Sequence, residues 1–60
     1  MENIKFNIHD KVRILSLHKD LIGIIVSIWI LDKAIRYEVR YFWENKPQEV
    51  FFYGWELEKT

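Results

Sequence analysis

A nearly continuous apolar stretch over residues 21–31 restricts how this chain can fold more than any other feature. In a β-strand, alternate side chains point to opposite faces. One face of such a strand would carry Ile22, Ile24, Val26, Ile28 and Ile30, and the other would carry Gly23, Ile25, Ser27, Trp29 and Leu31. Both faces are apolar, and a single small sheet buries only one of them. The stretch therefore predicts a strand whose second face is covered by another protein or by a second copy of the chain.

The length of the chain leaves little room for a core. It has 60 residues, of which 50% are hydrophobic, and it contains no cysteine. Neither a disulfide nor a thiolate zinc site is therefore available to stabilise a domain that lies near the lower size limit for independent folding. We expect a single domain over residues 1–60, stabilised by apolar burial and completed by self-association, with no metal and no cofactor.

The charge balance and the absence of targeting signals limit the partners and the cellular location that we expect for the protein. Nine basic and nine acidic residues give a net charge of zero, which argues against a general binder of polyanions. The N-terminus lacks the pattern of a signal peptide, and the apolar stretch is too short to span a bilayer. We expect a cytoplasmic protein that makes no contact with membranes.

The rest of the sequence also predicts β-structure. Alternating or apolar segments indicate strands over residues 11–15, 36–43 and 49–53, and residues 55–58 fit a short closing strand or a single helical turn. Polar segments predict a loop over residues 16–20 and turns at residues 32–33 and 44–48. Together with residues 21–31 these segments predict an all-β fold, a small and strongly bent five-stranded barrel with one short 3-10 turn near the C-terminus.

Four short patterns in the chain resemble the strands of SH3-like barrels of the KOW and Tudor kind. They are Phe6-x-Ile8-x-Asp10-x-Val12, Gly23-x-Ile25-x-x-Ile28, Tyr37-x-Val39-x-Tyr41 and Trp55-x-Leu57. The chain departs from that family at His9, where such barrels often carry glycine before the aspartate. Barrels of this size are similar to short accessory proteins of bacteria and their phages. That likeness implies an accessory factor or an inhibitor of a host defence protein.

More large apolar side chains are present than the core of such a barrel can hold. We expect these residues to form the core: Phe6, Ile8, Val12, Ile14, Ile25, Ile28, Tyr37, Val39, Tyr41, Val50, Phe52 and Leu57. The apolar side chains left over would form a larger exposed patch than monomers usually carry. We therefore predict a homodimer, or a complex with another protein, whose interface contains these residues, the two arginines at its rim: Ile24, Val26, Trp29, Ile30, Phe42, Trp43, Arg36 and Arg40.

Two other functions remain to be weighed against protein binding. The sequence predicts no enzyme and no catalytic residue, since no nucleophile, base and orienting group can be placed together. Nucleic-acid binding is the alternative, because Lys11, Arg13, Arg36 and Arg40 point outward near aromatic side chains that stack on bases. Glu38 lies between Arg36 and Arg40, however, and cross-strand charge pairs are ordinary in sheets. Protein binding is the favoured prediction.

Overall fold

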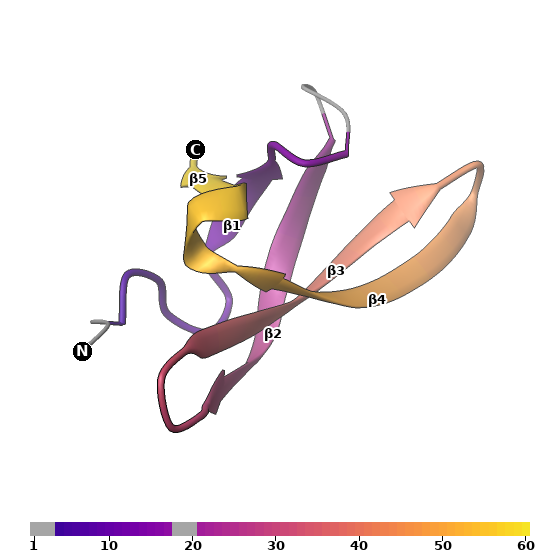
Figure 1. Ribbon diagram of the computed structural model, residues 1–60. Coiled ribbons are helices and arrows are strands. Elements are labelled where there is room, and N and C mark those ends of the chain that lie inside the picture. The colour runs from indigo at the N-terminus through magenta and orange to yellow at the C-terminus, as the bar shows by residue number, and fades with distance from the viewer. Residues whose placement is uncertain (1–3, 18–20) are drawn as a thin grey trace.

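The protein folds into one antiparallel sheet, seen in a computed structural model that describes residues 4–17 and 21–60 (Figure 1). Its elements are β1 (Lys11–Ile14), β2 (Ile22–Ile30), β3 (Ile35–Trp43), β4 (Lys46–Tyr53), the 3-10 turn η1 (Gly54–Glu56) and β5 (Leu57–Lys59). The strand order is β4-β3-β2-β1-β5. The predicted all-β class, with five strands and a short 3-10 turn near the C-terminus, is confirmed. The loop predicted over residues 16–20 lies partly outside the described residues.

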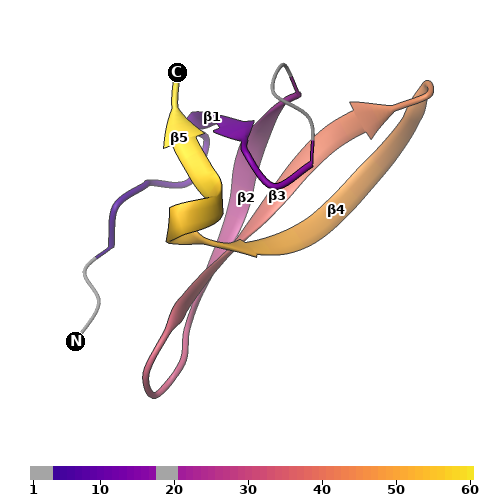
Figure 2. The ribbon, with the colours of Figure 1, turned by 45° about the horizontal axis from the view of Figure 1, so that its top comes forward.

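The hairpin of β3 and β4 extends away from β1 and β5 as an arm (Figures 1 and 2). Its turn consists of Glu44 and Asn45, whose φ angles of 52° and 63° are both left-handed, as a type I′ turn requires. The prediction of a longer turn through residue 48 is wrong. Pro47 lies inside β4, and proline is tolerated there because β4 is an edge strand.

The core lies on one side of the sheet. Its buried residues are Phe6, Val12, Ile14, Ile25, Ile35, Tyr37, Val39, Tyr41, Phe52 and Leu57, with Leu21 and Ile28 packed against them. Two predicted core residues are exposed: Ile8 lies in a turn, and Val50 lies on the edge strand. The sequence prediction also missed Ile35, which is buried at the start of β3.

The segment before β1 covers part of this core. The ring of Phe6 packs edge-on against that of Tyr37, with 5.2 Å between their centroids. The backbone N–H of Lys5 donates a hydrogen bond of 2.8 Å to the Tyr37 hydroxyl. The N–H of His9 bonds to the carbonyl of Ile25 at 2.8 Å, and the N–H of Ile25 bonds to the carbonyl of Asp10 at 3.0 Å. The segment is therefore attached to β3 at its start and to β2 at its end.

A β-bulge interrupts the pairing of β2 with β3. Ile25 lies opposite Val39 and Ser27 lies opposite Glu38, so Val26 is an extra residue without a partner on β3. A bulge of this kind increases the local twist and shifts the alternation of the strand by one residue. Beyond Val26 the two faces of β2 are therefore exchanged.

This exchange corrects the faces predicted for residues 21–31. Ile28 joins Ile25 on the core side, since it lies opposite the buried Tyr37. Trp29 lies opposite Arg36 and joins Ile24 on the side that faces away from the core. Strict alternation places Trp29 and Ile24 on different faces, and the bulge brings them onto one.

Gly23 allows the close approach of β2 to β3. A Cβ atom at this position would meet Val39 Cγ1 inside van der Waals contact and would lie 2.9 Å from the carbonyl oxygen of Arg40. We expect Gly23→Ala to lower the free energy of unfolding by about 1–3 kcal/mol, because the strands must separate to admit the methyl group. Urea denaturation measures the change, with Ile30→Ala at an exposed position of the same strand as control. Equal effects of the two variants would contradict the steric explanation.

His9 lies at the position of a turn that favours glycine. Its φ of 80° is left-handed, and the N–H of Asp10 closes the turn on the carbonyl of Asn7 at 3.1 Å. We expect His9→Gly to raise the free energy of unfolding by about 0.5–1 kcal/mol, since the cost of a left-handed conformation exceeds the added entropy of the unfolded chain. Thermal unfolding measures the shift. Ile8→Gly, in the same turn without a positive φ, should be destabilising, and a loss of stability in both variants would refute this account.

Candidate interaction surface

Alternate residues of β1 to β4 form the side of the sheet that faces away from the core, which we call the outer face. Direct pairing across the strands places the following residues on it: Lys11, Arg13, Ile22, Ile24, Ser27, Trp29, Arg36, Glu38, Arg40, Phe42, Pro47, Glu49, Phe51 and Tyr53. Aromatic and aliphatic side chains alternate here with charges of both signs. The apolar side chains among them are the surplus that the core does not hold.

One row of side chains crosses four strands of the outer face. Lys11 on β1 lies opposite Ile24 on β2, Ile24 lies opposite Arg40 on β3, and Arg40 lies opposite Glu49 on β4. Directly opposite residues have their side chains on the same face. The row therefore has a cation at its β1 end and a carboxylate at its β4 end.

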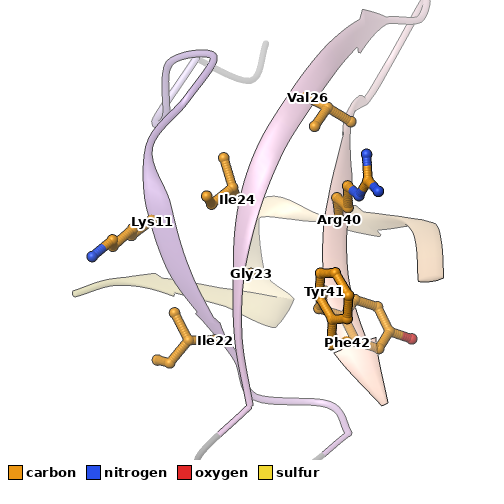
Figure 3. A pocket seen from close by; sticks show the side chains of 8 residues that line it. All are labelled: Lys11, Ile22, Gly23, Ile24, Val26, Arg40, Tyr41 and Phe42. Carbon is orange, nitrogen blue, oxygen red and sulfur yellow. The ribbon is translucent and has the colours of Figure 1, made fainter. Parts of the chain in front are cut away.

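A groove of about 430 Å³ lies on β1, β2 and β3 (Figure 3). Its lining is mostly apolar and consists of Lys11, Ile22, Gly23, Ile24, Val26, Arg40, Tyr41 and Phe42. Figure 3 shows Ile22 and Ile24 between Lys11 on one side and Arg40 and Phe42 on the other. Within residues 4–17 and 21–60, neither Lys11 nor Arg40 forms an ion pair. The groove therefore combines an apolar floor with two cations that lack a carboxylate partner in the described part of the chain.

An aromatic cluster lies further along the same face. The rings of Trp29 and Phe51 meet edge-on at 5.2 Å between centroids, and the guanidinium of Arg36 lies 5.1 Å from the centre of the Phe51 ring. Beside them the Ser27 hydroxyl donates a hydrogen bond of 2.7 Å to Glu38 Oε1. These contacts hold the side chains of three strands in place, which lowers the entropy cost of using them in an interface.

The outward edge of β4 has no free backbone N–H group at Pro47 or at Tyr53, near its two ends. Because the hairpin has a two-residue turn, the residues next to the turn form a hydrogen-bonded pair, and alternate residues from Pro47 onward direct their backbone N–H groups outward. Pro47 has no N–H group. At the other end, the N–H of Tyr53 donates to Glu56 Oε1 at 2.8 Å. An extended segment could therefore pair only with the middle of this strand.

Most of the residues predicted for an interface lie together. Ile24, Trp29, Arg36, Arg40 and Phe42 are on the outer face, and Val26 at the bulge lines the groove. The alternation of β2 and β3 places Ile30 and Trp43 on the opposite side of the sheet, at strand ends. The prediction omitted Ile22, Phe51 and Tyr53, which the structure adds to the outer face. The two-residue spacing from Ile24 could have identified Ile22.

Comparisons with known proteins identify no family for this chain. No family model, no curated protein and no solved structure matches the chain. The resemblance to SH3-like barrels of the KOW and Tudor kind therefore stays a prediction. In residues 4–17 and 21–60, no helix has the length and apolar character needed to cross a membrane.

Proposed function

We propose that the protein is a non-enzymatic protein-interaction module that forms a homodimer through its outer face. The observation that carries the proposal is the apolar surface on one side of the sheet. Ile22, Ile24, Trp29 and Phe42 are between 40% and 62% exposed there, although ten other hydrophobic residues among those described are buried. Monomeric proteins seldom leave large apolar side chains of one face uncovered together.

The composition of the outer face and the closed edge of β4 favour pairing of faces. Tryptophan, phenylalanine, tyrosine and arginine are the residues enriched at the centres of protein interfaces, and all four lie on the outer face. Pro47 and Glu56 restrict the alternative, in which β4 of two copies would pair edge to edge. A symmetric dimer needs a surface that is complementary to itself, and the outer face carries both signs of charge among apolar side chains.

The role in a cell belongs to the same proposal. The likeness to short accessory proteins of bacteria and phages favours a cytoplasmic accessory factor or inhibitor that binds one host protein. Affinity purification of the tagged chain from its host, compared with an outer-face variant, identifies the target. A target that the outer-face variant loses requires the dimer, and a target that both forms retain binds a surface outside the dimer interface.

The oligomeric state tests the proposal directly. We expect a dimer at micromolar concentration, measured by light scattering on a size-exclusion column. Ile24→Lys should give a monomer, because it buries an unpaired cation in the apolar interface between Lys11 and Arg40. Ile30→Lys is the matched control: Ile30 lies on the same strand, is 69% exposed and faces the other side of the sheet. A monomeric wild-type protein, or a dimer that survives Ile24→Lys, would overturn the proposed interface.

Nucleic-acid binding is the second candidate, since Lys11, Arg13, Arg36 and Arg40 all lie on the outer face. Three carboxylates lie among them or beside them, and Glu58 pairs with Arg13 at 2.9 Å. Four cations against three carboxylates give this face a small positive charge, which favours protein binding over nucleic-acid binding. We expect no retardation of single-stranded or duplex oligonucleotides in a gel-shift assay at low salt. Retardation that weakens steeply with added salt would favour the second candidate instead.

A further inference from the structure

The charges of the outer face limit how two copies can be arranged. In the row that crosses the sheet, Lys11 and Glu49 occupy opposite ends, on β1 and β4, and both side chains are exposed. Each lacks an ion pair within the described residues 4–17 and 21–60. An arrangement that superposes the β1 end of one copy on the β4 end of the other joins these opposite charges twice.

The groove and the aromatic ring beside it also lie at positions that would meet in such an arrangement. Ile22 on β2 and Phe42 on β3 each lie two residues beyond that row, on strands that pair with one another. Phe42 is the most exposed apolar side chain that lines the groove, and Ile22 forms part of the groove floor. A projecting ring beside a hollow on one face is what a self-complementary interface needs.

A single symmetry operation satisfies both relations. Two sheets that pack face to face keep their strands nearly aligned. A two-fold axis between the two outer faces, parallel to the strands and above the boundary of β2 and β3, places β1 of one copy over β4 of the other. It also places β2 over β3. Residues of one row then face residues of the same row in the second copy.

We propose that the groove of each copy receives Phe42 of the other, and that Lys11 of each copy faces Glu49 of the other. The occupant of the groove is thus a second copy of this chain, held by an apolar contact and two equivalent ion pairs. This arrangement rests on the proposed dimer and defines its geometry. It also gives Lys11 the carboxylate that the described part of its own chain does not provide.

Charge reversal tests the arrangement through a mixed dimer. In Lys11→Glu or Glu49→Lys alone, both symmetric contacts bring like charges together, and we expect the dimer dissociation constant to rise about tenfold. When the two variants are mixed, one contact is native and the other is reversed but attractive. The mixed dimer should therefore recover to within about threefold of the wild-type constant. Sedimentation velocity with one fluorescently labelled variant measures all three constants.

Control variants carry the same charge changes away from the outer face. Lys33→Glu and Glu44→Lys lie in the two hairpin turns, and neither should alter dimerisation alone or in mixture. For the groove, Phe42→Ala should weaken the dimer at least tenfold, whereas Trp43→Ala, the next residue on the opposite side, should not. Thermal unfolding of each variant distinguishes weaker association from loss of the fold.

The possible results separate the two proposals. A monomeric wild-type protein would overturn the homodimer and this arrangement together. A wild-type dimer that tolerates Lys11→Glu and Phe42→Ala would overturn the arrangement and leave the homodimer standing. Weakened single variants without recovery in the mixture would overturn the contact between Lys11 and Glu49.

Discussion

The extra residue at Val26 decides which apolar side chains of β2 are buried and which remain exposed. Before the bulge, Ile25 enters the core and Ile24 faces outward. After it, Ile28 packs against the core and Trp29 faces outward. One strand thus contributes to the core along its length while it builds a continuous outer face. The apolar groove and the aromatic cluster lie on one surface because of this single shift in register.

The small size of the chain explains why so much apolar surface stays outside. A single five-stranded sheet has one core side, and the segment that covers it is brief: Phe6 is the one residue before β1 that the described structure buries. No second layer covers the outer face in residues 4–17 and 21–60. Packing against a second copy would add the missing layer without lengthening the chain. Self-association would then bury the exposed apolar side chains and stabilise the fold at the same time.

The sequence could predict the strands and most of the core because each depends on local alternation. Tyr37, Val39 and Tyr41 follow the two-residue period of β3 without interruption, and all three are buried. Strict alternation misassigned the faces of β2 beyond Val26, because a bulge is set by the pairing of two strands and leaves no mark in Val26 itself. The predicted core nevertheless contained both Ile25 and Ile28, one on each side of the bulge. The length of the turn before β4 was overestimated because Pro47 suggests a loop, whereas an edge strand accepts it. Five of the eight predicted interface residues share the outer face. Two of them flank the bulge in β2, and the other three lie at alternate positions of β3.

The net charge of zero has a different meaning once the outer face is known. In the central row Lys11 lies at the β1 end and Glu49 at the β4 end, with Arg40 between Ile24 and Glu49. Such a row attracts a second copy whose β1 lies over its β4, because Lys11 then faces Glu49. It repels a copy whose β1 lies over its β1, because like charges then meet. Apolar contact supplies most of the affinity in such an interface, and the charges select among the possible orientations. A chain with no net charge can therefore still carry charges that favour one orientation of the dimer. That preference distinguishes a specific dimer from nonspecific association of apolar faces.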